Sequence, residues 1–361
     1  MEVTQAAAEH GLAALAGSSP DVGVVGYSLG GGLSWLARKH GLATNSITAV
    51  ELVTADGRLV RADADNEPEL FWAVRGGGGN FGVVTSIDFR LYPITEVYAG
   101  WLIWPLERAT EVLTAWQEWT ETVPDEMTSV GRLLNIPPLP EVPEPLRGRS
   151  VVVVEAIYIG DEAEGAELLA PLRALGPEID TVAIMPASAL QTLHMDPEEP
   201  VPGIGDGMML DRLTPEAIAK LVDVVGPDSP LLSVEVRHLG GELGRTSPDN
   251  GVLASLEAEY LMFAVGLPMT VEIGEAIERD VALIQRALAR WDASRMYLNF
   301  AEQPRSGLSL FGEDGYARLR RVKTEIDPDN LFHANHQVEP ADQGRRRADR
   351  RRIVDSQRRA A

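Results

Sequence analysis

Two glycine-rich stretches have the residue types and spacing to support chemistry. The first contains Gly23 and Gly26 and ends in the run Gly30–Gly32. Glycine lets the backbone approach a flat or charged ligand closely, and a glycine-rich turn before a helix can direct N–H groups at a phosphate. Neither the P-loop spacing nor the dinucleotide spacing Gly-x-Gly-x-x-Gly in a strand–helix context is met. Taken alone, the run fits a structural turn at least as well as a ligand site.

The second stretch runs from Leu70 to Thr85 and contains four consecutive glycines, Gly76–Gly79, between aromatic residues and an apolar segment. Such a run is tolerated where something must pass close to the backbone. A bound cofactor and a tight crossing of two chain segments are both open interpretations.

The surrounding residue patterns predict the elements that must position these stretches. We expect helices at 3–16, 33–40, 69–73, 106–122, 162–175, 273–288 and 316–326, and strands at 22–27, 47–55, 59–62, 83–92, 101–104, 150–159, 232–239 and 296–300. Asp56-Gly57 predicts a hairpin between 47–55 and 59–62. The order of these elements predicts an α+β fold with two lobes.

Length and charge limit the class of protein. The chain has 361 residues, more than the roughly 250–300 at which single cores stop growing, so two lobes are expected. The net charge of -22 makes nucleic acid an unexpected partner. Without an apolar run of about 18 residues or a leader pattern, we expect no membrane contact and a cytoplasmic location. The Arg-rich residues 341–361 are expected to be disordered.

Cysteine and histidine usage argues against a metal site. The chain has no cysteine, which removes disulfides and thiolate ligands. His194, His333 and His336 are scattered without matching carboxylates, so no metal is expected. His194 is interpreted as a structural residue.

Motifs at both ends of the chain carry a family resemblance. Gly30–Gly32, the Leu70–Thr85 stretch, Tyr297-Leu298-Asn299-Phe300 and the segment 327–337 resemble, in order and spacing, the berberine bridge enzyme-like oxidases. The resemblance implies the C-terminal half of an FAD-binding domain of the PCMH type (1–95). It also implies a substrate-binding domain with an antiparallel sheet flanked by helices (96–300) and a segment returning to the first domain (301–340).

The same resemblance implies a cofactor, a reaction and a set of residues. The reaction would be oxidation of an alcohol, a sugar or a natural product by hydride transfer to N5 of FAD, with a small molecule as partner and the oligomeric state left open. The residues expected to hold the cofactor are Gly23, Gly26, Gly30, Gly31, Gly32, Gly82, Val83, Val84, Asn299 and Asn335.

The resemblance also places a reactive strand just before Gly240-Gly241, with Glu235, Arg237 and His238 as candidate catalytic residues. Alternate residues of a strand share a face, so Glu235 and Arg237 point together. Arginine stays protonated and is a poor base, but it could lower the pKa of a nearby phenol.

Tyr297 is the strongest single candidate for proton transfer. Its phenol, with an ordinary pKa near 10, could accept a substrate hydroxyl proton if a neighbouring cation stabilised the phenolate. Asn299 would lie on the same face and could contact the flavin. The competing interpretations are a buried strand tyrosine and a strand-end cap.

The sequence departs from the family pattern at the flavin anchors. The family's N-terminal histidine motif is absent, and Ser19 stands where many members have a cysteine that bonds the flavin. We therefore expect an N-terminally truncated member with FAD held non-covalently. A catalytically inactive remnant, or a binding protein without redox chemistry, are the alternatives.

Overall fold

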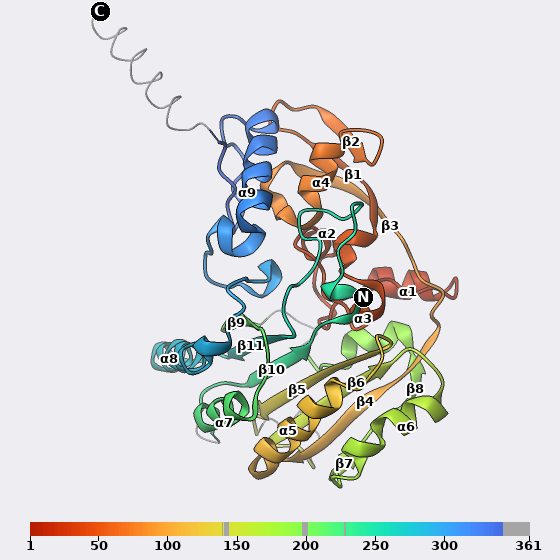
Figure 1. Cartoon of the computed structure of the whole chain (residues 1–361), viewed down its shortest axis with the longest axis vertical. Helices are drawn as coiled ribbons and strands as arrows, with labels where there is room; N and C mark the ends of the chain where they lie inside the picture. Colours follow the sequence, from red (N-terminus) through yellow and green to blue (C-terminus); the bar gives the residue numbers. More distant parts are fainter. Residues whose placement is uncertain (139, 141–143, 197–200, 227–228, 342–361) are drawn as a thin grey trace, which may run out of the picture.

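The computed structural model describes residues 1–138, 140, 144–196, 201–226 and 229–341, and the Arg-rich tail predicted at 341–361 lies almost wholly outside them. The described residues form two lobes, each built from an antiparallel sheet and helices (Figure 1). The predicted α+β fold with two lobes is confirmed. None of the described helices is both long and apolar enough to cross a membrane.

The element bounds follow in chain order. The α-helices are α1 (Glu2–Ala8), α2 (Val24–Leu29), α3 (Ala37–His40), α4 (Pro68–Gly77), α5 (Ala109–Thr120), α6 (Glu162–Arg173), α7 (Pro215–Val224), α8 (Val271–Leu288) and α9 (Gly307–Ile326). The strands are β1 (Ile47–Val53), β2 (Leu59–Asp63), β3 (Val83–Phe89), β4 (Glu96–Pro105), β5 (Met127–Asn135), β6 (Ser150–Tyr158), β7 (Ile179–Asp180), β8 (Ala183–Pro186), β9 (Ile204–Leu210), β10 (Ser233–His238) and β11 (Tyr260–Gly266). Short 3₁₀ turns are η1 (Ala43–Ser46), η2 (Gly78–Asn80), η3 (Leu106–Arg108), η4 (Ala187–Thr192), η5 (Gly241–Gly244), η6 (Ala289–Trp291) and η7 (Leu298–Phe300).

The first lobe, at the top of Figure 1, is the sheet β2-β1-β3 with α4 and α9 packed beside it. The hairpin predicted at Asp56-Gly57 is confirmed, with β1 and β2 antiparallel. The C-terminal helix α9 returns to this lobe, where Arg318 Nη2 lies 2.6 Å from Glu69 Oε1 of α4. The buried Lys323 Nζ donates to the Asn80 carbonyl at 2.7 Å. These contacts hold α9 against α4 and the turn that follows it in the first lobe.

The second lobe is one large antiparallel sheet in the order β7-β4-β6-β5-β10-β11-β9, with β8 paired to β4. One face is covered by helices, and its core includes Trp104, Trp116, Leu221 and Ile284 from β4, α5, α7 and α8. Because strand side chains alternate between faces, the even-numbered Val234 and Val236 of β10 belong to this helix-covered core.

The other face of the large sheet meets loops of the first lobe. Trp35 and Leu36 pack with Val97 and Val130 of the sheet, and a neighbouring cluster joins Leu33 and Leu42 to Leu239 and Tyr297. Odd-numbered residues of β10 therefore point toward the first lobe, where the two lobes meet.

Four predicted elements differ in the structure. The strand predicted at 22–27 is instead the helix α2, since a short apolar run does not distinguish a strand from a buried helix. The strand predicted at 296–300 is wrong, because Tyr297 is extended but the 3₁₀ turn η7 follows it at once. The helices predicted at 3–16 and 33–40 shorten to α1 and α3, and Gly11 within the first range has a positive φ.

The glycine run Gly76–Gly79 contains a tight crossing. A Cβ at Gly76 would lie 2.3 Å from Leu253 Cβ and 2.7 Å from Leu253 N, and Gly76 has a φ of +101°. Replacing Gly76 by alanine is expected to lower the free energy of unfolding by about 1–3 kcal/mol, from overpacking and backbone strain together. Urea denaturation would measure this. Gly79→Ala is the matched control, because nothing lies within 4 Å of a Cβ there, and an equal loss in both variants would contradict the crossing.

Candidate functional site

A cavity of about 650 Å³ lies where the two lobes meet. Its walls come from the loop before α2, from α2, from β10 and β11, and from the segment around η7. The residues lining it are Gly17, Ser18, Ser19, Val22, Gly23, Gly26, Tyr27, Leu33, Arg237, Phe263, Tyr297, Asn299, Phe300 and Glu302. Its lining combines aromatic rings with a few polar groups, which is the usual composition of a small-molecule site.

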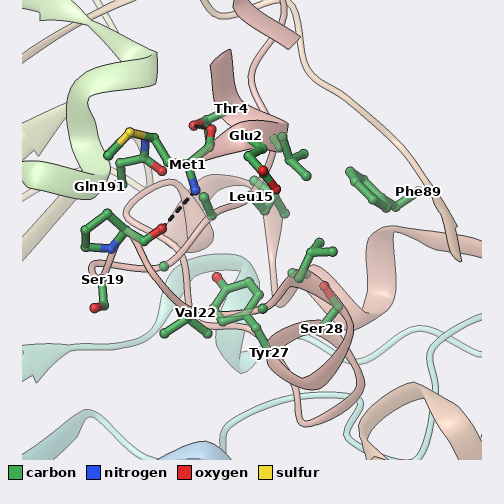
Figure 2. A pocket seen from close by; sticks show the side chains of 18 of the residues that line it. Met1, Glu2, Thr4, Leu15, Ser19, Val22, Tyr27, Ser28, Phe89 and Gln191 are labelled. Atoms are coloured by element: carbon green, nitrogen blue, oxygen red, sulfur yellow. Dashed lines mark hydrogen bonds between the residues drawn. The ribbon is translucent and has the colours of Figure 1, made fainter. Parts of the chain in front are cut away.

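A second cavity, of about 340 Å³, adjoins the first through shared residues of the loop before α2 and of α2 itself, among them Ser19, Val22 and Tyr27. Figure 2 shows Tyr27 and Val22 on one side of it, with Met1 and Leu15 across from them. The Met1 amino group donates to the Pro20 carbonyl at 2.9 Å. The two cavities therefore lie against the same glycine-containing segment.

The first glycine stretch divides into two parts with different surroundings. At Gly23 and Gly26 a Cβ would have nothing within 4 Å, so these residues present open backbone to the cavity. The run that follows packs tightly against side chains instead: a Cβ at Gly30 would lie 1.8 Å from Asn299 Oδ1, one at Gly31 2.6 Å from Tyr297 Cε2, and one at Gly32 2.8 Å from Tyr27 Cε1. This run therefore lets the Tyr297–Asn299 segment approach α2.

Tyr297 is fully buried at the end of the cavity and its Oη accepts a hydrogen bond from Asn299 Nδ2 at 3.2 Å. The same amide nitrogen donates to the Tyr27 carbonyl at 2.9 Å. Burial raises the pKa of Tyr297 well above its ordinary value, although Asn299, the backbone N–H groups of Gly32 and Leu33, and Arg237 all act to lower it. The hydroxyl is protonated at neutral pH, with donors directed at its oxygen.

Arg237 and Glu235 lie on the first-lobe face of β10, as strand alternation predicts. Arg237 Nε donates to Glu235 Oε1 at 2.9 Å, and its Nη2 donates to Ser18 Oγ at 3.0 Å. Burial acts to raise the pKa of Glu235, but the charges of Arg237 and His194 outweigh it and hold that pKa well below the usual range. Glu235 is therefore an ionised group that fixes Arg237, and only Arg237 of the two lines the cavity.

Behind Glu235 lies a buried row of charged side chains on the same face of β10, β5 and β6. His194 Nε2 lies 2.8 Å from Glu235 Oε2, and His194 Nδ1 lies 2.8 Å from Glu155 Oε2. Arg132 follows, 3.4 Å from Glu155. We call Arg132, Glu155, His194, Glu235 and Arg237 the charged row. Burial and Arg132 act to lower the pKa of His194, but Glu155 and Glu235 leave it raised.

His238 is not in the cavity. Its neighbours on the even-numbered face of β10 belong to the helix-covered core, and its Nε2 lies 2.6 Å from Arg38 Nη1. Burial, followed by the charge of Arg38, lowers its pKa well below the ordinary value. The structure separates this residue from Glu235 and Arg237.

Seven residues expected to hold the cofactor line neither cavity. Three of them are Gly30–Gly32, which pack against side chains as described above, and the other four are Gly82, Val83, Val84 and Asn335. A Cβ at Gly82 would meet the Val53 carbonyl at 2.7 Å, so this glycine serves the pairing of β3 with β1. Val83 is 59% exposed and, with Val84, lies on β3. Asn335 is exposed in the loop after α9. The cavities are lined instead by residues of the first stretch and of the segment around η7.

Sequence reasoning missed three groups at the site. Tyr27 places a buried hydroxyl with no hydrogen-bond partner beside the cavity. Glu302 lines the cavity, and burial followed by the charge of Asp206 raises its pKa. Glu155 completes the charged row, and a signal for it exists, because it interrupts the apolar run of β6. Within the described residues, no group of three or more His, Asp or Glu side chains could hold a metal.

Comparison with known proteins gives the family. The model for "Berberine and berberine like" matches residues 296–339, and that for "FAD binding domain" matches residues 1–63. (R)-6-hydroxynicotine oxidase of Paenarthrobacter nicotinovorans is 30% identical over 94% of this chain and 75% of its own length.

Solved structures agree with this. 6-Hydroxy-D-nicotine oxidase from Arthrobacter nicotinovorans has a TM-score of 0.78 at 27% identity, over 94% of this chain and 76% of the other. The D396N variant of Physcomitrella patens BBE-like 1 has a TM-score of 0.81 at 18% identity, over 93% of this chain and 75% of the other, and supports the fold. This chain belongs to the berberine bridge enzyme-like family of FAD-linked oxidoreductases.

Proposed function

We propose that this chain oxidises a hydroxyl-bearing small molecule, an alcohol, a sugar or a natural product, with FAD held non-covalently and with no nucleic acid or membrane as partner. The observation that carries the proposal is the cavity in which Tyr297, Asn299 and Arg237 meet beside the open glycines Gly23 and Gly26. The absence of cysteine supports non-covalent binding, because no thioether to the flavin can form from this chain.

The residues around the cavities fit a flat, polar-edged cofactor. Gly23 and Gly26 leave room for a ring to approach the backbone, and the buried Tyr27 hydroxyl lacks a hydrogen-bond partner that a ligand edge could supply. Ser18 and Asn299 add polar groups nearby. We propose that these residues hold FAD, which when bound supplies the acceptor for a hydride at N5.

The chain's own residues handle the proton that leaves with the hydride. Oxidation of a secondary or primary alcohol releases one hydride from carbon and one proton from the hydroxyl. We assign the proton to Tyr297 Oη, whose phenolate form would be stabilised by the Asn299 amide, the Gly32 and Leu33 N–H groups and Arg237. Glu302, at the same cavity, is the second candidate acceptor.

The absorbance spectrum of the purified chain, before and after incubation with FAD and desalting, tests cofactor binding. A retained flavin band that is bleached anaerobically by one of a panel of alcohols, sugars and hydroxy acids is the expected result. A spectrum that shows no flavin band after incubation with a large molar excess of FAD would contradict the proposal. It would favour the inactive or non-redox alternatives.

The rate of flavin reduction should rise with pH. Because burial raises the pKa of Tyr297 above its ordinary value of about 10, the phenolate fraction increases tenfold with each pH unit up to that value. We therefore expect a steady rise from about pH 7 to about pH 10 without a plateau. Stopped-flow reduction across this range would measure it. A plateau reached near about pH 6 would instead assign the proton to a carboxylate such as Glu302.

A further inference from the structure

We propose that the substrate of this cavity is an organic acid with a flat, apolar body, and that the guanidinium of Arg237 binds its carboxylate. The inference rests on the proposed function, because it names the substrate class of the same cavity. It follows from the free edge of one buried cation, from the way that cation is held, and from the walls around it.

The guanidinium of Arg237 has an unused donor at the cavity. Its Nε and Nη2 are engaged by Glu235 and Ser18, whereas Nη1 has no hydrogen-bond partner among the residues that the structure describes. The side chain is 8% exposed and lines the cavity. A desolvated guanidinium with a free N–H edge binds a carboxylate by short, charge-assisted hydrogen bonds.

The guanidinium is also held in place. Its Cζ lies 5.0 Å from the centre of the Phe300 ring and 5.4 Å from that of Trp35. Glu235, which accepts two hydrogen bonds from the guanidinium, is itself held by His194 at 2.8 Å. A cation whose plane is fixed by two rings and a bonded carboxylate loses little freedom when a ligand binds, which favours affinity.

The charged row leaves positive charge at the cavity. Both nitrogens of His194 lie 2.8 Å from carboxylate oxygens. In this arrangement each nitrogen donates a hydrogen bond, so the ring is doubly protonated and carries a positive charge. The row then contains the three cations Arg132, His194 and Arg237 and the two anions Glu155 and Glu235. Asp196, partly buried nearby, interacts with Arg237 through charge alone, and it leaves the unused Nη1 edge without a bonded anion.

The remaining walls define the rest of the ligand. Phe263 and Phe300 meet edge to face at 5.1 Å, and Tyr297 lies 5.5 Å from Phe300. These rings favour a flat, apolar body. Glu302 lines the same cavity and would repel a second negative group, so the cavity fits a monoanion whose hydroxyl is directed toward Tyr297.

Two probes of equal shape, benzoate and benzamide, test the proposal by calorimetric titration of the protein with and without FAD. In the wild-type chain we expect benzoate to bind about tenfold to a hundredfold more tightly than benzamide, the effect of a hydrogen bond to a charged group. The double variant Arg237→Gln/Glu235→Gln removes one positive and one negative charge together, and there the preference should vanish. The matched control is Arg245→Gln/Glu242→Gln, which removes an exposed ion pair that lines neither cavity and should keep the preference.

Equal binding of the two probes to wild-type protein, or a preference that survives the double variant, would overturn the proposal. A preference that disappears when FAD is added would overturn it too, because the guanidinium would then serve the cofactor. Failure to bind FAD would contradict the proposed function separately, since the two probes are also compared in flavin-free protein.

Discussion

Replacing Tyr297 by phenylalanine is expected to slow flavin reduction by substrate about 10²- to 10⁴-fold, the usual contribution of a positioned acid–base group. The substitution removes only the hydroxyl, and the ring keeps its contact with Phe300. Binding of FAD should weaken by no more than about tenfold, the effect of one neutral hydrogen bond. Anaerobic stopped-flow reduction and fluorescence titration with FAD would measure the two quantities.

Tyr260→Phe provides the control for this variant. The Tyr260 hydroxyl bonds to Thr120 at 2.6 Å in the helix-covered core of the second lobe, so its loss should change stability and leave the reduction rate unchanged. A Tyr297→Phe variant that is reduced at the wild-type rate would remove Tyr297 from proton transfer. The pH dependence in that variant gives a second readout, because the rise with pH should disappear with the phenol.

The sequence predicted the fold well where local signals were strong. Asp56-Gly57 between β-branched runs predicted the β1–β2 hairpin, and the amphipathic pattern near Ile273 predicted α8. The patterns did not reveal β5, β9 or β11. Gly131 in β5 and Gly207 in β9 weaken the strand signal, yet each glycine is required by close packing, against Trp116 in one case and the Phe300 carbonyl in the other.

The sequence predicted some residues of the site correctly and misjudged the contacts of others. Tyr297, Asn299 and Arg237 meet at the cavity, and alternation along a strand was enough to place Glu235 beside Arg237. His238, offered as a candidate with them, lies away from the cavity beside Arg38. The assignment of a direct cofactor contact to Gly30–Gly32 missed what these residues touch, which is side chains from the far end of the chain. A glycine run signals close approach, and only tertiary structure identifies what approaches.

Of the charged row, only Glu235 and Arg237 were candidates from the sequence. Glu155 interrupts an apolar run, but no sequence pattern brings it together with Arg132 and His194, because these residues come from separate strands and a loop. Glu155 is 1% exposed in β6, and His194 follows η4 at 4% exposure. Two carboxylates and a histidine buried together are tolerated only when each is paired. The interpretation of His194 as a structural residue stays a prediction, and its stability effect can be measured.

His194→Gln is expected to lower the free energy of unfolding by about 3 kcal/mol, because it removes the cation between two buried carboxylates, Glu155 and Glu235. The loss should depend on pH. The pKa of His194 is raised in the folded chain, so its contribution is fully present below the unfolded value of about 6.5 and is lost as the pH rises through the folded value.

At acid pH, the stabilising contribution of the His194–Glu235 pair is limited by the protonation of Glu235. Its pKa is lowered in the folded chain, so its contribution is present above the unfolded value of about 4.3 and is lost as the pH falls through the folded value. The difference between wild type and His194→Gln should therefore be largest between about pH 4.3 and about pH 6.5 and should shrink toward alkaline pH. Urea denaturation at a series of pH values would measure it.

His238→Gln is the matched control. His238, the last residue of β10, is buried like His194, but its pKa lies well below the ordinary value. A neutral buried histidine loses its stabilising effect as the pH falls, because the unfolded chain takes up the proton first. The cost of His238→Gln should thus shrink toward acid pH, opposite to that of His194→Gln. If both variants showed the same trend, His194 would not carry a proton between the two carboxylates, and the positive charge assigned to the cavity end of the charged row would be wrong.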